Sequence, residues 1–157
     1  MRTAAVLTIS DSVKQGTRHD TAGPALAKLR EESGYTVIMR DSVADERQTI
    51  SAALLQLCEA AQLIVTTGGT GISARDVTPE ATEDVCERLL PGIAELMRTE
   101  GLKQTPLAPL SRAVCGTKGR SLIINTPGNP DGAQHSLRAV LNLVPHALDL
   151  LAGKTNH

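Results

Sequence analysis

The chain has 157 residues, with 16 basic and 17 acidic side chains and a formal net charge of -1. This length lets a single domain, residues 1–157, bury its own apolar core. Tyr35 is the one aromatic residue, since Phe and Trp are absent. Stacking on single-stranded nucleic acid needs several aromatic rings, and binding to a duplex needs a basic excess, so the composition excludes both classes of partner.

Apolar runs and cysteines indicate where the protein works. No apolar run approaches the roughly 20 residues that span a bilayer, and Asp11 interrupts the N-terminal apolar stretch before a secretory signal is complete. Cys58, Cys86 and Cys115 are odd in number and form no Cys-x-x-Cys pair. Such cysteines are typical of a reducing compartment. We therefore predict a cytoplasmic protein that does not bind membranes.

The first half of the chain alternates apolar runs with amphipathic segments. Short aliphatic runs predict buried strands at residues 3–9, 35–39 and 63–67. Helical spacing predicts helices at residues 23–32, from Asp45 to about Cys58, and from Thr78 to about Leu90. Gln48 stands three residues after Asp45, which is the spacing of a capping box. Strands that alternate with helices indicate parallel crossovers.

The second half adds an antiparallel element. Its predicted elements are a helix at residues 93–98 after the break at Pro91-Gly92, a hairpin of strands at 113–117 and 121–125, and a helix at 131–151. Pro145 predicts a kink or a break in this last helix. The predicted fold class is α/β, with three α/β/α layers around a mostly parallel mixed sheet.

Candidate site residues follow the predicted strands, because ligands of open α/β sheets bind beyond the carboxyl ends of the strands. We select these polar and glycine-rich rim residues: Ser10, Asp11, Thr67, Gly68, Gly69, Thr70, Gly71, Asn125, Pro127, Gly128, Asn129 and Pro130. Ser10 and Asp11 form a polar break after the first strand. Asn125 offers a donor and an acceptor to a heterocycle.

The glycine run after the third strand has two interpretations. Backbone N–H groups in such a loop can turn toward one anion, and Thr67 and Thr70 can add hydroxyl donors. A plain glycine turn explains the run equally well. The loop is not a Walker A motif, because Ile72 and Ser73 stand where Lys and Ser or Thr are needed. The Pro127–Pro130 turn, before a helix, is likewise either an anion site or a connector.

Asp45 and Asp76 form a second candidate group. Each follows a strand and precedes a helix, so capping is the first explanation for either one alone. Together at the mouth of a glycine loop, the two carboxylates can instead hold a hydrated Mg²⁺ whose other positions go to substrate phosphates. The histidines show no ligand spacing, and we interpret them as surface or helix-face residues: His19, His135, His146 and His157.

Several motifs occur together and in order along essentially the whole chain. They are Thr8 to Ser12, Asp20 to Pro24, Ala44 to Glu46, Thr66 to Gly71 with Arg75 to Ala81, Leu110 to Arg112, and Asn125 to Pro130. This order resembles the molybdenum-cofactor biosynthesis domain of the MogA, MoaB and gephyrin-G type. The stretch from Thr66 to Ala81 is the most specific part of the resemblance.

The resemblance implies a homotrimeric α/β protein that adenylylates molybdopterin with ATP. Asp45 and Asp76 match the acidic positions that matter in the MogA branch, which makes them the expected catalytic and Mg²⁺-binding residues. The Ser10-Asp11 pair, the glycine loop, Ser111 and the Asn125–Pro130 loop correspond to ligand-contacting regions. The family also implies a metal-insertion protein of the MoeA type on a separate chain.

Two alternative functions are compatible with the same resemblance. The first is a MoaB-like protein that binds molybdopterin with little or no transferase activity. The second is a trimeric scaffold whose glycine loop is a turn and whose aspartates are caps. In each case a bound pterin or adenine lacks a Phe or Trp ring to stack on. We therefore expect backbone groups, polar edges such as Asn125, and aliphatic walls such as Ile72 and Pro127 to recognise it.

Overall fold

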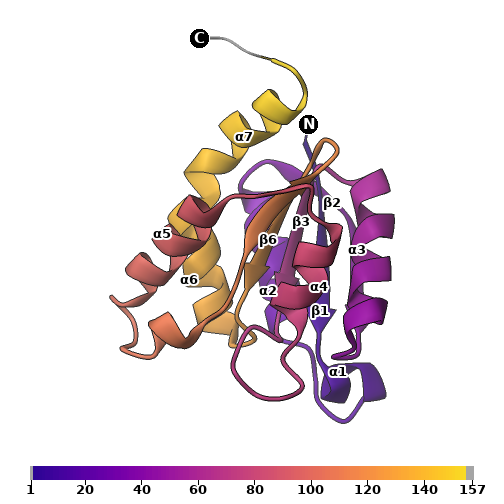
Figure 1. Ribbon diagram of the computed structural model, residues 1–157, viewed down its shortest axis with the longest axis vertical. Helices are drawn as coiled ribbons and strands as arrows, with labels where there is room; N and C mark the ends of the chain where they lie inside the picture. Colours follow the sequence, from indigo (N-terminus) through magenta and orange to yellow (C-terminus); the bar gives the residue numbers. More distant parts are fainter. Residues whose placement is uncertain (1, 155–157) are drawn as a thin grey trace.

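A six-stranded mixed sheet runs through the middle of the protein, with helices on both faces (Figure 1). The computed structural model describes residues 2–154 and, of Arg30, only the backbone. The strands are β1 (Arg2–Ile9), β2 (Tyr35–Val43), β3 (Leu63–Thr67), β4 (Arg88–Leu89), β5 (Cys115–Lys118) and β6 (Ser121–Thr126). Their order is β2-β1-β3-β6-β5-β4. Strand β5 pairs antiparallel with both β4 and β6, whereas the other neighbouring strands pair parallel. The predicted mixed, mostly parallel sheet is confirmed.

The helices cover the sheet unequally. They are α1 (Asp11–Gln15), α2 (Ala22–Glu32), α3 (Arg47–Ala60), α4 (Thr78–Val85), α5 (Pro91–Gly101), η1 (Ala108–Leu110), α6 (Pro130–Val140), η2 (Leu141–Leu143) and α7 (Val144–Leu151). Buried side chains of α2, α5, α6 and α7 pack in one core, and those of α3 and α4 pack in the other. The three predicted layers are therefore present. No helix within residues 2–154 is long and apolar enough to cross a membrane.

Side chains of β1 show why the strands were predictable. Ala4 and Val6 face the core under α2, α5, α6 and α7, whereas Ala5 and Leu7 face the core under α3 and α4. All four are buried. A strand buried on both faces reads as an unbroken apolar run, which is the pattern that predicted it.

The predicted helix from Thr78 to about Leu90 is wrong in its second half. The helix ends at Val85, and Arg88 and Leu89 form the edge strand β4. Glu87 N donates to Thr117 O and Leu90 N donates to Cys115 O, both in β5, at 2.8 Å each. Pairing with a distant strand therefore overrides the local helical spacing.

Smaller differences lie at element boundaries. Helix α1 occupies the segment predicted as a polar break, because the Ser10 side chain caps its first turn by accepting from Val13 N at 3.3 Å. Strand β2 continues to Val43, and α5 begins at Pro91. The long C-terminal helix is broken as predicted: η2 separates α6 from α7, and Pro145 lies in the first turn of α7.

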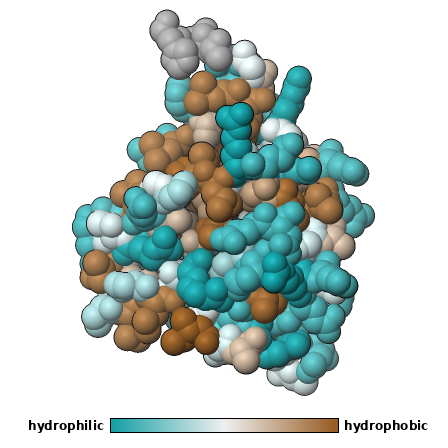
Figure 2. All heavy atoms as spheres, viewed as in Figure 1, coloured by the Kyte–Doolittle hydropathy of each residue, from teal (hydrophilic) through white to brown (hydrophobic). Residues whose placement is uncertain are grey.

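The surface drawn in Figure 2 is uneven in character. Hydrophilic residues predominate on the right, over α3, whereas apolar residues gather at the lower left, over the segment that follows α5. That segment exposes Leu102, Leu107 and Leu110 by 52%, 66% and 53%. Part of it forms a wall of the cavity described next.

Candidate active site

A cavity of about 890 Å³ opens beyond the carboxyl ends of β1, β3 and β6, where the fold predicts a ligand site. Most of the predicted site residues line it: Ser10, Asp45, Gly68, Gly69, Thr70, Gly71, Asp76, Ser111, Asn125, Pro127, Gly128 and Asn129. Asp11, Thr67 and Pro130 are not among its lining residues. Residues that are far apart in the sequence thus meet at one edge of the sheet.

The glycine loop after β3 passes very close to its neighbours. Gly68 and Gly69 have φ of 102° and 69°, which side-chain-bearing residues rarely adopt. A Cβ at Gly68 would collide with the carbonyl oxygen of Ile9, and one at Gly69 with the hydroxyl of Thr78. That hydroxyl donates to Gly68 O at 2.9 Å. The fold itself therefore requires glycine at both positions.

The threonine hydroxyl before this loop is used inside the protein. Thr67 is buried and donates to the carbonyl oxygen of Pro127 at 2.7 Å. This hydrogen bond ties the glycine loop to the turn after β6. The predicted contact of Thr67 with a bound anion stays a prediction, whereas Thr70 lines the cavity.

Asp45 does not cap the helix that follows it. The N-cap of α3 is Glu46, with no side-chain cap. Instead, Asp45 and Asp11 exchange hydrogen bonds: Asp11 N donates to Asp45 Oδ2, and Asp45 N donates to Asp11 Oδ1, both at 2.9 Å. Burial raises the pKa of Asp45, and the nearby charges of Asp11 and Asp76 raise it further. The predicted capping box with Gln48 is likewise absent.

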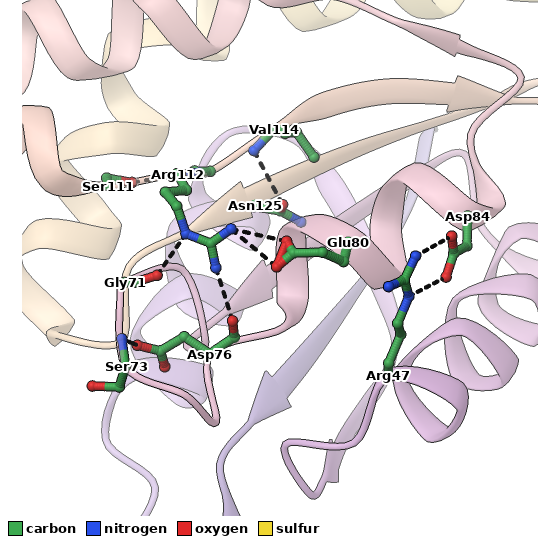
Figure 3. Close-up of polar contacts among 11 residues, drawn as sticks. Arg47, Gly71, Ser73, Asp76, Glu80, Asp84, Ser111, Arg112, Val114 and Asn125 are labelled. Carbon is green, nitrogen blue, oxygen red and sulfur yellow. Dashed lines mark hydrogen bonds and ion pairs between the residues drawn. The ribbon is translucent and has the colours of Figure 1, made fainter.

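Asp76 does not cap its helix either, since the N-cap of α4 is Val77. Its carboxylate accepts from Ser73 N at 3.0 Å and closes the loop between Gly71 and α4 (Figure 3). A Cβ at Gly71 would lie 2.8 Å from Asp76 Oδ2, just as one at Gly69 would lie 3.2 Å from Asp45 Oδ1. The two carboxylates therefore approach the glycine loop on either side of Thr70.

This arrangement suits Mg²⁺. Residues 2–154 contain no cluster of three or more His, Cys, Asp or Glu side chains able to hold a metal ion. Mg²⁺ does not need such a cage, because it commonly binds through one or two carboxylates, waters and substrate phosphates. Repulsion from Asp11 and Asp76 contributes to the raised pKa of Asp45, and a bound cation relieves that repulsion. Asp45 and Asp76 are the residues that would hold it.

Asp11 supports the site from outside the cavity. Arg75 donates to both of its carboxylate oxygens, with Nε–Oδ2 at 3.0 Å and Nη2–Oδ1 at 2.8 Å. The Arg75 guanidinium holds the pKa of Asp11 below its usual value. Asp11 therefore bonds both Arg75 and the backbone of Asp45, and its predicted ligand contact stays a prediction.

Asn125 is fully buried and is also used internally. Its Oδ1 accepts from Val114 N at 3.1 Å (Figure 3), and its Nδ2 donates to the hydroxyls of Thr66 and Thr82 at 3.0 Å each. Both hydrogens of the side-chain amide are thus bonded within the protein. The side chain joins β6 to β3 and α4, and its predicted contact with a heterocycle stays a prediction.

Replacing Asn125 with Ala is expected to destabilise the protein by about 1 to 3 kcal/mol, because it leaves buried polar groups without their partner. Urea unfolding of both proteins measures the difference. Gln134, whose side chain donates to Pro130 O at 3.3 Å near the surface of α6, provides the matched control. Equal destabilisation by Asn125→Ala and Gln134→Ala would contradict this role.

Arg112 and Glu80 form an ion pair beside the loop (Figure 3), with Arg112 Nη1 at 3.0 and 2.9 Å from the two carboxylate oxygens. Hydrogen bonding to Arg112 lowers the pKa of Glu80 below its usual value. A carboxylate whose pKa is lowered by folding stabilises the fold above its unfolded pKa, and this stabilisation is lost as the pH falls through the folded pKa.

The stability difference between the wild type and Glu80→Gln is therefore expected to shrink as the pH falls from about 6 to about 3, because the unfolded pKa of Glu is about 4.3. Urea unfolding at several pH values measures it. A difference that stays constant, or that grows toward low pH, would show that the ion pair does not act in this way.

One wall of the cavity has no counterpart among the predicted site residues. This wall comes from α5, the segment after it, and α6, and includes Met97, Arg98, Gln104, Thr105, Leu107, His135 and Ser136. His135, predicted on the surface or on a helix face, has its ring nitrogen Nε2 2.9 Å from Glu100 O. Asp131, Gly132, His135 and Ser136 share one helical face after the Pro127–Pro130 turn, and this spacing is the signal that could have predicted the wall.

Comparison with known proteins identifies the family. Residues 5–146 match the family described as "Probable molybdopterin binding domain". This chain belongs to that family. The resemblance inferred from the motifs is thereby confirmed.

Relatives of this family cover nearly the whole chain. The molybdopterin adenylyltransferase of Helicobacter pylori strain 26695 is 43% identical over 152 residues, which are 94% of this chain and 86% of that protein. The enzyme of that name from Escherichia coli K12 is 34% identical, over 94% of this chain and 84% of its own. The molybdopterin biosynthesis enzyme MoaB of Thermus thermophilus has a TM-score of 0.91 and 45% identity, over 98% of both chains.

The cavity of this family member is walled by aliphatic rather than aromatic side chains. The one aromatic residue of the chain, Tyr35, lines a different pocket. Pro127 lines the cavity as expected, together with Met97 and Leu107. Ile72 is 73% exposed and is not among the lining residues, so its prediction as an aliphatic wall is wrong.

Proposed function

We propose that this protein is a molybdopterin adenylyltransferase, which transfers AMP from ATP to the phosphate of molybdopterin and releases pyrophosphate. The observation that supports this proposal most is that Asp45 and Asp76 line the same cavity as the glycine loop and approach that loop at Gly69 and Gly71. The names of the 43% and 34% identical relatives support the same activity. We propose further that the reaction depends on Mg²⁺.

The proposed reaction needs positioning and charge neutralisation. A phosphate oxygen of molybdopterin attacks the α-phosphorus of ATP, the bond from that phosphorus to the bridging oxygen of the β-phosphate breaks, and pyrophosphate leaves. The attacking phosphate is already ionised at neutral pH, so neither a protein nucleophile nor a general base is required. This agrees with a site built from carboxylates and backbone.

Each part of the site has a role in this proposal. When bound, Mg²⁺ supplies positive charge to the phosphates that must come together. Asp45 and Asp76 would hold it, and backbone N–H groups from Gly69 to Gly71 would donate to phosphate oxygens, since Gly68 N already donates to Thr126 O at 3.1 Å. Met97, Leu107 and Pro127 line the cavity and would contact the ring systems of the substrates.

One alternative function is kept for testing. It is a MoaB-like protein that binds molybdopterin with little or no transfer, and this chain is 45% identical to the molybdopterin biosynthesis enzyme MoaB of Thermus thermophilus. The scaffold alternative loses its basis, since it treats Asp45 and Asp76 as helix caps and neither carboxylate caps its helix.

The family resemblance extends the proposal to assembly and location. It implies a homotrimer in the cytoplasm, whose product passes to a metal-insertion protein of the MoeA type on a separate chain. The free state of Cys58, Cys86 and Cys115 is typical of a reducing compartment. Burial raises the pKa of Cys86 to about 11 and that of Cys115 to about 12, so both thiols stay protonated near neutral pH.

Incubation of the protein with molybdopterin, ATP and Mg²⁺ tests the proposal. We expect pyrophosphate and a pterin product whose mass has increased by one adenylyl group. Omission of Mg²⁺ in the presence of a chelator is expected to stop the reaction. Tight binding of molybdopterin without either product would favour the binding-only alternative.

A further inference from the structure

Arg112 contacts both ends of the loop that carries Asp76, and its contacts exceed those of an ordinary surface ion pair. Its backbone N donates to Thr70 O and its Nε to Gly71 O, both at 2.8 Å. Its Nη2 donates to Asp76 O, also at 2.8 Å, and its Nη1 pairs with Glu80 (Figure 3). One residue therefore holds the start of the loop, its end, and the first turn of α4.

Arg112 is itself held in place from the other side. Ser111 and Ala113 stand on either side of Arg112 in the sequence. Arg98 Nη1 donates to the carbonyl oxygens of both, at 3.3 and 2.9 Å. The guanidinium thus projects from an anchored segment. Since Arg98 and Ser111 line the cavity, this chain of contacts connects the wall formed by α5 and α6 to the glycine loop.

We infer that Arg112 is a positioning residue, which fixes the carboxylate of Asp76 relative to Asp45 by joining Gly71 O to Asp76 O. This inference rests on the proposed function for its catalytic consequence. A planar guanidinium directs its donors in a fixed fork, so it reaches two carbonyls and a carboxylate at once. A lysine ammonium keeps the charge near Glu80 without that fork. Arg112→Lys is therefore the informative variant.

Amide exchange of Ser73 and Asp76 measures the effect on the loop directly. Both N–H groups are hydrogen-bonded within the loop, to Asp76 Oδ2 and to Ser73 O, at 3.0 Å each. We expect their exchange in Arg112→Lys to be faster by about tenfold, because loss of charge-assisted hydrogen bonds favours local opening. This readout requires neither metal nor substrate.

Two further variants separate positioning from simple charge pairing. Arg47 forms a bidentate pair with Asp84, at 2.7 and 2.8 Å, and touches no loop carbonyl, so Arg47→Lys should leave the exchange unchanged (Figure 3). Glu80→Gln removes the carboxylate and leaves the bonds to Gly71 O and Asp76 O. Its effect on exchange should be smaller than that of Arg112→Lys.

Steady-state kinetics measure the catalytic consequence. In Arg112→Lys we expect kcat to fall about 10- to 100-fold and KM for ATP to rise, with molybdopterin affinity unchanged, because displacement of a positioning group by about 1 Å costs rate on this scale. A loss of folded protein lowers kcat alone. Faster loop exchange with this kinetic split supports the inference, and equal exchange in Arg112→Lys, Arg47→Lys and the wild type overturns it. Absence of transfer by the wild type contradicts the proposed function instead.

Discussion

Replacing Asp45 or Asp76 with Asn is expected to lower the rate of adenylyl transfer by about 100-fold or more, since a metal clamp on phosphates supplies several kcal/mol and each 1.36 kcal/mol is about tenfold in rate. Asn preserves the size of each side chain, and its oxygen can still accept the bonds from Asp11 N and Ser73 N. The loss is therefore one of charge. Single-turnover pyrophosphate release measures it.

A matched control is Asp84→Asn. Asp84 pairs with Arg47 on α3 and is not among the residues that line the cavity. We expect this variant to transfer adenylyl groups at the wild-type rate. Binding of molybdopterin is expected to survive in all three variants, which equilibrium titration measures. Full turnover in both the Asp45 and the Asp76 variants would refute their assignment as metal-binding catalytic residues.

Gly68→Ala is expected to destabilise the protein by about 3 kcal/mol or more, the sum of a strained φ and of overpacking against backbone. Gly68 has φ of 102°, and a Cβ there meets the carbonyl oxygen of Ile9 in β1, which has no flexible end that can move away. In a chain of this size the melting temperature should fall by about 6 to 12 °C. Thermal unfolding followed by circular dichroism measures the shift.

The matched glycine is Gly92 in the first turn of α5. A Cβ at Gly92 meets nothing within 4 Å, and its φ is not positive. Gly92→Ala should therefore leave stability unchanged or raise it by about 0.5 to 1 kcal/mol. If Gly68→Ala and Gly92→Ala unfold at the same temperature, the close passage of the loop against β1 is not important for stability.

The buried half of the fold was the most predictable from the sequence. Strands β1 and β3 lie between two helical layers. Their sequences are therefore unbroken apolar runs, which lack the amphipathic spacing of a surface helix. The same logic locates the site, because the carboxyl ends of parallel strands meet at one edge of the sheet. This rule predicts that Ser10, Gly68 and Pro127 lie together at this edge, and all three line the same cavity.

Elements that depend on distant partners were not predictable in this way. Strand β4 forms because Arg88 and Leu89 pair with β5, and their local sequence still has helical spacing. The same holds for side chains with two possible partners. The hydroxyl of Thr67 and the amide of Asn125 are suited to a ligand, but each finds its hydrogen-bond partner in a strand or turn distant in sequence.

The roles of Asp45 and Asp76 also depend on contacts with residues that are distant in the sequence. Local sequence favours helix caps, because an Asp before a helix commonly has that role. The reciprocal bonds between Asp45 and Asp11, across 34 positions, turn the first carboxylate away from its helix. The contacts of Arg112 with Gly71 and Asp76 arrange the second. Neither contact has a signature in the local spacing.

The fate of the phosphates of ATP is the most direct test of the proposed activity. The protein is incubated with molybdopterin and Mg²⁺, in parallel with ATP labelled at the α-phosphate and with ATP labelled at the γ-phosphate. Adenylyl transfer at this cavity predicts the α label in the pterin product and the γ label in pyrophosphate. Appearance of the γ label in the pterin, or an unlabelled pterin that is nevertheless tightly bound, would contradict it.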